Sequence, residues 1–301
     1  VTVEAVNDPP TVAAVTATTA EDTPASIPLT GDDLDGDLLT VLLWDRSVGT
    51  ELDVTSVNGG IVSIAATGEN AATATYTPPQ DFVGSDTFEY IANDGSEDSA
   101  AATATVTVTA VNDAPAVSAV TATTAEDTPV DVPLVGLDVD GDALTLLLWD
   151  VEFTTLGPVT TANGGTVEVG ATTADQAIAT YTPATDFVGT DTFEFLANDG
   201  VLDGEVATVT VTVEAVNDAP SATAASGATA EDTPVAFDLT GSDIDGDAIV
   251  VLLWDGAAGV TTDVSSANGG VVSIGATSGA TATVTYTPVA DLAARIPSSS
   301  S

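Results

Sequence analysis

The segment Asp138-Val139-Asp140-Gly141-Asp142 occurs three times in the 301-residue chain, with only its second residue changed. Its other copies are Asp33-Leu34-Asp35-Gly36-Asp37 and Asp243-Ile244-Asp245-Gly246-Asp247. Both copies lie 105 residues away, since 138 − 33 and 243 − 138 both equal 105. A fixed spacing of this kind indicates an array of equal structural units. The chain is therefore predicted to consist of tandem repeats of 105 residues.

Five other motifs keep the same offset without insertion, which defines the repeat boundaries. In the second copy they are Val-Asn-Asp-Ala from Val111, Glu-Asp-Thr-Pro from Glu126, Leu-Leu-Trp-Asp ending at Asp150, Asn-Gly-Gly from Asn163 and Tyr-Thr-Pro from Tyr181. The predicted domains are repeat 1 (9–113), repeat 2 (114–218) and an incomplete repeat 3 (219–301), whose pattern breaks after Asp291. Residues 1–8 match 211–218, so they are predicted to be the last strand of a preceding repeat or a donor strand.

Short runs of Val, Thr and Ala between turn signals predict β-strands throughout. In repeat 2 the predicted strands are 116–125, a strand ending near 137, 143–150, strands starting at 166 and 176, 192–197 and 206–213. About seven short antiparallel strands in a hundred residues indicate an all-β immunoglobulin-like sandwich. Its predicted core contains Tyr181, Phe187, Phe193 and Phe195. The run 146–149 is apolar on both faces, which predicts burial by a neighbouring strand or loop, or a lateral contact between molecules.

The composition excludes several classes of function. There are 46 acidic residues against two basic ones, Arg46 and Arg295, and neither His nor Cys occurs. Nucleic acid is excluded as a partner because phosphate binding requires clustered Lys and Arg. The missing Cys excludes disulfides and thiol catalysis. No apolar run is long enough to cross a membrane, so no membrane insertion is expected.

A formal charge of −44 strains a compact fold unless cations accompany the carboxylates. Adaptation to high salt is the alternative explanation. High charge is also typical of disorder, but 44% of the residues are hydrophobic and alternate with Thr, which predicts a buried core. The chain starts at Val1 within a strand pattern, which favours a processed or excerpted chain.

Carboxylates at alternate positions before and after a glycine are typical of loops that bind a hard cation. Ca²⁺ takes about 6–8 oxygen ligands, and glycine permits the sharp bend. A solvated acidic turn is the simpler interpretation of any single copy, because Asp and Gly are also common in ordinary turns. Three copies in fixed register favour calcium.

The predicted topology gathers the acidic motifs of each repeat at the two ends of its sandwich. At the first junction the expected ligands are Glu21, Asp22, Asp45, Asp81 and Asp86 of repeat 1, Asn112 and Asp113 of the linker, and Asp138, Asp140, Asp142, Asn198 and Asp199 of repeat 2. The second junction repeats them as Glu126, Asp127, Asp150, Asp186, Asp191, Asn217, Asp218, Asp243, Asp245 and Asp247. The outer ends offer Asn7, Asp8, Asp33, Asp35, Asp37, Asn93 and Asp94, and Glu231 and Asp232. So many carboxylates at one junction predict about two or three Ca²⁺ ions there.

Together, the Val-Asn-Asp-Ala-Pro linker, the Glu-Asp-Thr-Pro corner, the Asp-x-Asp-Gly-Asp loop, Asp-Phe-x-Gly-x-Asp-x-Phe and Asn-Asp-Gly resemble the cadherin-like tandem repeats of bacterial and archaeal surface adhesins. The resemblance implies a secreted, elongated rod whose linkers are stiffened by calcium. It gives ligand roles to Glu21, Asn112, Asp113, Asp138 and Asp140. The Leu-Leu-Trp-Asp strand and the shortened repeat 3 depart from the family pattern.

The sequence therefore predicts a non-enzymatic, calcium-binding stalk of an extracellular fibre or adhesin. A carbohydrate-binding or host-binding adhesin domain is the alternative, although such domains usually break the repeat with insertions. Catalysis is not expected, because every carboxylate pair recurs with the repeat. The expected partners are neighbouring copies of the chain, joined head to tail with 1–8 as a donated strand, and cell-surface or matrix molecules.

Overall fold

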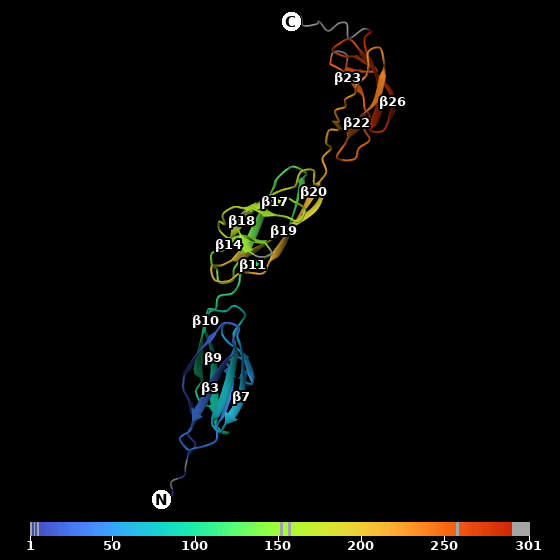
Figure 1. The fold of residues 1–301 in the computed structure, drawn as a ribbon. Helices are drawn as coiled ribbons and strands as arrows, with labels where there is room; N and C mark the ends of the chain where they lie inside the picture. Colours follow the sequence, from blue (N-terminus) through green and yellow to red (C-terminus); the bar gives the residue numbers. More distant parts are fainter. Residues whose placement is uncertain are drawn as a thin grey trace, which may run out of the picture.

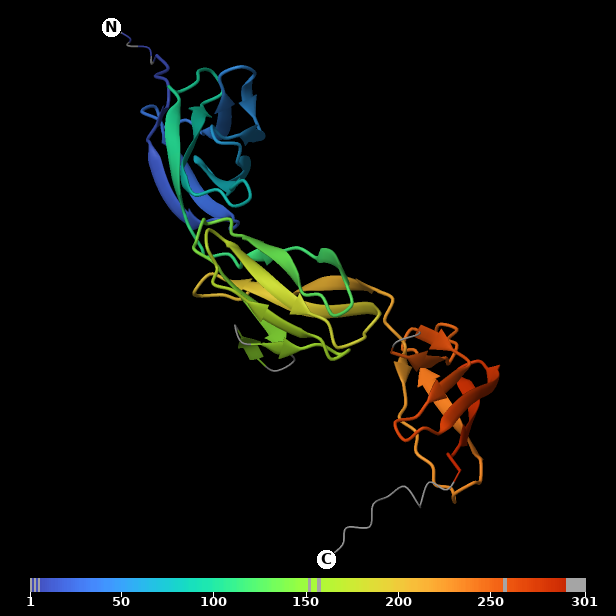
Figure 2. The same cartoon turned by 90° about the horizontal axis from the view of Figure 1, so that it is seen from above.

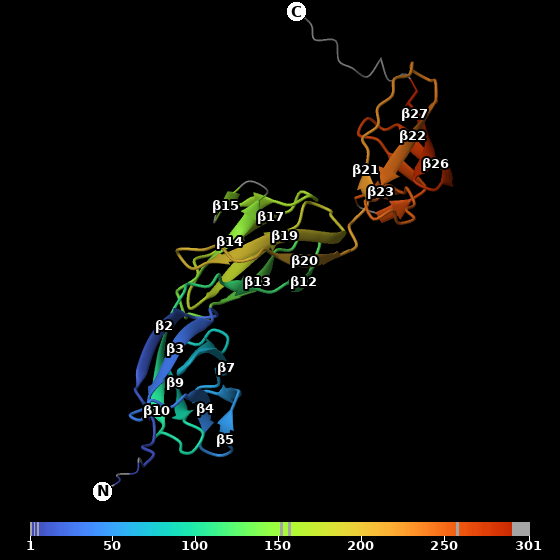
Figure 3. The ribbon, with the colours of Figure 1, turned by 90° about the horizontal axis from the view of Figure 1, so that it is seen from below.

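Three β-sandwich domains follow one another along an elongated chain (Figure 1). This computed structural model describes residues 2, 4, 6–150, 153–155, 158–256 and 259–290. All regular secondary structure in these residues is β, which confirms the predicted all-β array. Seen from two further directions, successive domains meet end to end through a single linker each (Figures 2 and 3).

Repeat 1 forms a two-sheet sandwich. Its strands are β1 (Thr11–Val12), β2 (Val15–Ala20), β3 (Ala25–Asp32), β4 (Thr40–Asp45), β5 (Gly49–Glu51), β6 (Asp53–Thr55), β7 (Ile61–Gly68), β8 (Ala71–Thr77), β9 (Gly84–Asn93) and β10 (Ala102–Thr109). One sheet has the order β1-β3-β8-β7-β6, and the other has the order β2-β10-β9-β4-β5. The last strand, β10, therefore leaves the domain next to the corner after β2, where the linker to repeat 2 begins.

Repeat 2 has the same topology. Its strands are β11 (Ala116–Val117), β12 (Val120–Ala125), β13 (Val130–Leu137), β14 (Thr145–Asp150), β15 (Phe153–Thr155), β16 (Val159–Thr160), β17 (Thr166–Val169), β18 (Gln176–Thr182), β19 (Gly189–Asn198) and β20 (Ala207–Glu214). The stretch 116–125, predicted as one antiparallel strand, forms two strands in different sheets. β11 pairs with β13, whereas β12 pairs in parallel with β20. The sequence gives no sign of this change because 116–125 is a continuous run of Ala, Val, Ser and Thr without Gly or Pro.

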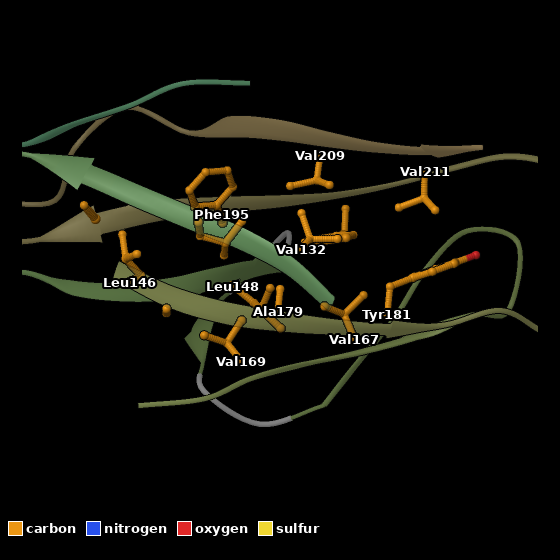
Figure 4. Packing of buried hydrophobic residues seen from close by; sticks show 14 of the residues in the cluster. Val132, Leu146, Leu148, Val167, Val169, Ala179, Tyr181, Phe195, Val209 and Val211 are labelled. Carbon is orange, nitrogen blue, oxygen red and sulfur yellow. The ribbon is translucent and has the colours of Figure 1, made fainter. Parts of the chain in front are cut away.

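The core of repeat 2 is filled by the inward-facing residues of both sheets (Figure 4). Leu146, Leu148, Tyr181 and Phe195 are completely buried, and Phe193 and Phe187 pack with them, as predicted. On the opposite face of β14, Leu147 is half-buried. Gly165 is required beside Tyr181, because a Cβ atom there would lie 2.7 Å from the ring.

Repeat 3 has one complete sheet and a short second one. Its strands are β21 (Ser221–Ala222), β22 (Val235–Ser242), β23 (Leu253–Asp255), β24 (Gly259–Thr261), β25 (Asp263–Ser265), β26 (Val271–Ser278) and β27 (Thr281–Thr287). The first sheet has the order β21-β22-β27-β26-β25, and the second contains only β23 and β24 among the described residues. Residues 1, 3 and 5 of the predicted donor strand and Asp291 lie outside the described part of the chain.

Candidate metal centres

At the junction between repeats 1 and 2, three segments bring one carboxylate each to the same place. Glu21 follows β2, Asp81 lies in the loop between β8 and β9, and Asp113 belongs to the linker after β10. One oxygen of each residue lies within 4.8 Å of the others. Two oxygens that bind one Ca²⁺ at about 2.4 Å lie at most about 4.8 Å apart, so the cluster has the size of a calcium site.

Backbone hydrogen bonds hold the repeat 1 side of this cluster. The Glu21 side chain is 5% exposed, and its Oε1 accepts a hydrogen bond of 2.6 Å from the N–H of Val111 in the linker. The N–H of Asp81 donates to Asp22 Oδ1 at 3.2 Å, which joins the two loops. Both Asp22 and Asp81 have positive φ, 51° and 55°, a conformation that Asp tolerates better than most residues. Hydrogen bonds within the protein are therefore sufficient to connect this corner to the linker.

The repeat 2 side is a second carboxylate cluster, formed by the loop after β13. Oxygens of Asp138, Asp140 and Asp142 lie within 4.8 Å of one another. Asp138 Oδ1 accepts a hydrogen bond from the N–H of Asp142 at 3.0 Å, and Gly141 makes the bend with φ of 81°. The N–H of Asp113 donates to Asp140 Oδ2 at 2.9 Å, so the linker joins this loop to the first cluster.

The turn between β19 and β20 fixes the linker asparagine. Asn112 Nδ2 donates to Asp199 Oδ2 at 2.8 Å. The other oxygen of Asp199 accepts hydrogen bonds from the N–H groups of Leu202 and Val201. The Leu202 N–H, followed by the Asn112 amide, holds the pKa of Asp199 below its usual value. Asp199 therefore acts in this structure as a support for the linker.

Several oxygens at these clusters have no protein partner. Among the described residues, Oδ2 of Asp33, Asp113, Asp138 and Asp218 is buried and accepts no hydrogen bond. Loss of solvation, and then repulsion by Glu21 and Asp140, raises the pKa of Asp113. Buried carboxylate oxygens without a partner are costly, and a bound cation satisfies them. The donor set thus fits a hard divalent cation.

The junction between repeats 2 and 3 repeats the first of the two clusters, whereas the predicted ligands Asp243, Asp245 and Asp247 do not form a second one. Glu126, Asp186 and Asp218 form its first cluster, again with oxygens within 4.8 Å of one another. The N–H of Val216 donates to Glu126 Oε1 at 2.5 Å, and the N–H of Asp218 donates to Asp245 Oδ2 at 2.7 Å. Loss of solvation, and then repulsion by Asp245 and Glu126, raises the pKa of Asp218.

The linker side of a junction also forms at the start of the chain. Asp33, Asp35 and Asp37 gather within 4.8 Å, and the N–H of Asp8 donates to Asp35 Oδ2 at 2.7 Å. Asn7 Nδ2 donates to Asp94 Oδ2 at 2.9 Å. The linker and the domain that follows it therefore assemble this half without the preceding domain.

In repeat 3, the N–H of Asp247 donates a hydrogen bond to Asp243 Oδ1 at 3.1 Å, as the N–H of Asp142 does to Asp138 in repeat 2. Glu231 and Asp232, predicted as ligands, are exposed. The corner that contains them resembles those of Glu21 and Glu126, both of which are buried. The glutamate of this corner is therefore buried in repeats 1 and 2 and exposed in repeat 3.

Two predicted ligands, Asp86 and its counterpart Asp191, lie elsewhere, and their assignment is wrong. Both are 1% exposed, and their oxygens accept hydrogen bonds from the protein. Asp191 Oδ2 accepts from the hydroxyl groups of Tyr181, at 2.9 Å, and Thr161, and Oδ1 accepts from the N–H of Thr192 at 2.9 Å. Asp86 has the corresponding partners Tyr76, Ser56 and Thr87. The regular offset of Tyr76 and Asp86 is the only sequence signal of this network.

The structure also places other predicted ligands outside the clusters. Asp45 builds the turn after β4, where the hydroxyl and then the N–H of Ser47 lower its pKa. Asn93 and Asn198 are occupied within their own turns, since their amides donate to Asp98 and Asp203 and their oxygens accept from Gly95 and Gly200. Asp94 and Asp199 bind the linker asparagines. Asp150 ends β14, and its side chain lies outside the described structure.

The fold and its acidic junctions define a tandem immunoglobulin-like repeat protein. The sequence profile described as "Bacterial Ig domain" matches residues 7–109, 112–214 and 217–295. The chain belongs to this family. The three matched segments correspond to the three strand groups of the structure.

Two curated relatives come from Dictyostelium discoideum. "Integrin beta-like protein A" is 32% identical over 193 residues, which are 60% of this chain and 10% of that protein. "Integrin beta-like protein B" is 32% identical over 89 residues, 29% of this chain and 5% of that protein. The chain thus spans a tenth or less of the relatives that it matches.

Among solved structures, cadherin domains 1–4 of protocadherin gamma B7 match with 14% identity and a TM-score of 0.49, over 96% of this chain and 70% of that chain. The part of the chain that the structure describes contains no helix able to cross a membrane.

Proposed function

We propose that the chain is a calcium-stiffened stalk segment of an extracellular or cell-surface protein. The observation that carries this proposal is the meeting of Glu21, Asp81 and Asp113, from two loops of repeat 1 and the linker, within the span of one calcium ion. The buried Oδ2 of Asp113 supports the proposal, because that oxygen accepts no hydrogen bond from the described residues and is free to bind a cation.

Glu21, Asp81 and Asp113 would hold one ion, and Asp138, Asp140 and Asp142 would hold a second in the next domain. Asp113 belongs to the first cluster and is bonded through its N–H to Asp140 of the second. An ion supplies the positive charge that offsets the mutual repulsion of these carboxylates. The first ion would fix the linker to repeat 1, and the hydrogen bond from Asp113 to Asp140 continues this connection into repeat 2.

An adhesive role and a surface location are part of this proposal. The names of the two integrin beta-like relatives support them, although the match covers little of those proteins. Membership of the bacterial Ig domain family supports a structural role without catalysis. Head-to-tail self-association, predicted from the sequence, remains a prediction, and sedimentation with and without calcium would test it.

Thermal unfolding in CaCl₂ and in a chelator tests the proposal and separates it from adaptation to high salt. A ligand that binds the native state at a thousandfold excess over its Kd adds about 4 kcal/mol. For domains of this size, such an effect raises Tm by about 15 °C or more. We expect millimolar CaCl₂ to give this increase and NaCl of equal ionic strength to give little. Equal melting in both salts would mean that screening alone stabilises the chain.

Asp113→Asn provides the sharper test at the first junction, with Glu168→Gln as a matched control. Glu168 is exposed on β17, outside the clusters, and its variant also removes one negative charge. We expect D113N to raise Tm in chelator, because it relieves repulsion, and to reduce the gain from calcium. E168Q should change neither. A full calcium response in D113N would remove this residue from the site.

A further inference from the structure

A hollow on the flank of the sandwich recurs in repeats 1 and 2, away from the junction clusters. In repeat 1 its volume is about 400 Å³, and it is lined by Trp44, Val54, Phe88 and Glu89 and, at its edge, by the largely exposed Arg46, among others. In repeat 2 the corresponding hollow of about 290 Å³ is lined by Trp149, Val159, Phe193 and Glu194. Every one of these pairs is separated by 105 residues. The site is therefore built into the repeat.

The Trp and the Glu of each hollow are neighbours across two strands. Trp44 is paired with Glu89 in the register of β4 and β9, and Trp149 is paired with Glu194 in that of β14 and β19. An aromatic ring beside a carboxylate favours a planar cation, which the ring face and the carboxylate both attract.

Repeat 1 pairs the carboxylate of this hollow with its own cation. Arg46 also lines the hollow, and both ends of its guanidinium donate to Glu89: Nε to Oε2 at 2.8 Å, and Nη2 to Oε1. The hydrogen bonds from Arg46 lower the pKa of Glu89. The side chain of Glu89 is 20% exposed in this pair.

Repeat 2 has the same hollow without the cation. The offset places Val151 at the position of Arg46, and the only other basic residue of the chain is Arg295. Glu194 is exposed, in contrast to Glu89. The carboxylate and the ring therefore face solvent in an arrangement that repeat 1 uses to hold a guanidinium group.

We propose that the hollow of repeat 2, lined by Trp149 and Glu194, binds an arginine side chain of another protein. Arg46 shows the binding mode in the homologous place, with a fork that matches the two carboxylate oxygens. The formal charge of −44 favours the approach of basic partners. The inference does not depend on calcium, because none of the junction carboxylates lines this hollow in repeat 2.

Tryptophan fluorescence of the full chain tests the site, because each repeat contains one Trp. In W44F/W254F, Trp149 is the sole reporter. We expect arginine amide to change its emission saturably in the millimolar range, and citrulline amide, whose side chain ends in an uncharged urea group, to have no effect. Glu194→Gln should weaken the arginine response at least about fivefold, because it removes the charged acceptor. Glu168→Gln, with the same loss of charge on β17, should leave it unchanged.

Repeat 1 supplies the reciprocal experiment. In W149F/W254F, Trp44 should respond weakly, because Arg46 already occupies Glu89. Adding Arg46→Val should create a response like that of Trp149. No saturable change at Trp149, or equal responses in E194Q and E168Q, would overturn the proposal. Failure of R46V to create a response would also contradict it, because the geometry is otherwise shared. Thermal melts of each variant identify any loss of folding.

Discussion

Repeats 2 and 3 share their motifs but differ in how much of their apolar surface is buried. In repeat 2, Leu146 is completely buried, and Leu147 and Trp149 are half-buried. In repeat 3, the counterpart Val251 is only half-buried, Leu252 is 56% exposed and Trp254 is 69% exposed. The offset places the counterparts of β19 and β20 at 294–303 and 312–319, and no described residue takes those places. The same strand sequence therefore forms a closed core only where the second sheet is complete.

The comparison extends to the turns and linkers at the acidic junctions. In repeat 2 the turn between β19 and β20 supplies Asp199, which holds Asn112 of the linker at 2.8 Å. The corresponding Asn217 donates to the backbone oxygen of its neighbour Asp218 at 2.9 Å. Completion of the second sheet therefore organises both the core and the linker that enters the domain.

The largest effect is expected from completing repeat 3. We would replace 291–301 with a copy of 186–218, which carries β19, β20 and the following linker in the correct offset. Burying a large apolar side chain contributes about 1.5–3 kcal/mol, so repeat 3 should gain several kcal/mol of stability. In W44F/W149F, the emission of Trp254 should move to shorter wavelength because the ring becomes buried. The urea concentration at the midpoint of unfolding of repeat 3, followed at Trp254, should rise.

The matched control carries the same graft with Phe193→Ser and Phe195→Ser in the copied segment, because these residues fill the core of repeat 2. It should leave Trp254 exposed. An unchanged Trp254 spectrum in the graft without these two substitutions would show that the exposure of Trp254 does not result from the absence of the copied strands.

The next effect concerns the buried Asp191, whose counterpart in repeat 3 is Ile296 by offset. Asp191→Ala should destabilise repeat 2 by about 2–4 kcal/mol, because the buried donors of Tyr181, Thr161 and Thr192 lose their acceptor. Urea unfolding followed at Trp149 in W44F/W254F measures the change. Asp131→Ala, at an exposed position of β13, is the control and should cost much less. Equal costs would place Asp191 outside the supporting network.

The sequence predicted the fold through its repeats and alternation, because those patterns depend on residues close in the chain. It also predicted that Glu21 meets Asp113 and that the loop of Asp140 lies beside the same linker, because the strand order carries the corner, linker and loop to one end. It failed at Asp86, because only tertiary contacts show that Ser56 and Tyr76 turn this carboxylate into the core. The split of 116–125 between sheets was likewise invisible, since no Gly or Pro marks the point where the chain changes sheets.

Acid should act on repeat 1 through Asp86. Burial alone would raise the pKa of Asp86, but hydrogen bonds from Ser56, Asn58, Tyr76 and Thr87 together lower it. A pKa lowered in the folded state gives stability that is present above the unfolded pKa of about 3.9 and lost as pH falls through the folded value. Urea unfolding followed at Trp44 in W149F/W254F should show this loss below about pH 4. In D86N the acid-dependent part should shrink, and an identical pH profile would contradict the assignment.

The smallest effects, with opposite signs, are expected from one substitution at equivalent positions. Ser56 and Ser266 are separated by two repeats, since 266 − 56 = 210. Ser56 Oγ donates to the buried Asp86, whereas Ser266 Oγ is buried without a hydrogen-bond partner among the described residues. Ser56→Ala should destabilise repeat 1 by about 1–2 kcal/mol, because a charged acceptor loses a donor. Ser266→Ala should be neutral or stabilise repeat 3 by up to about 1 kcal/mol, because it removes an unpaired buried hydroxyl. Urea unfolding followed at Trp44 in W149F/W254F and at Trp254 in W44F/W149F measures the two changes in stability. Equal losses of stability in the two repeats would show that the hydrogen bond to Asp86 is not the reason why the Ser56 hydroxyl stabilises repeat 1.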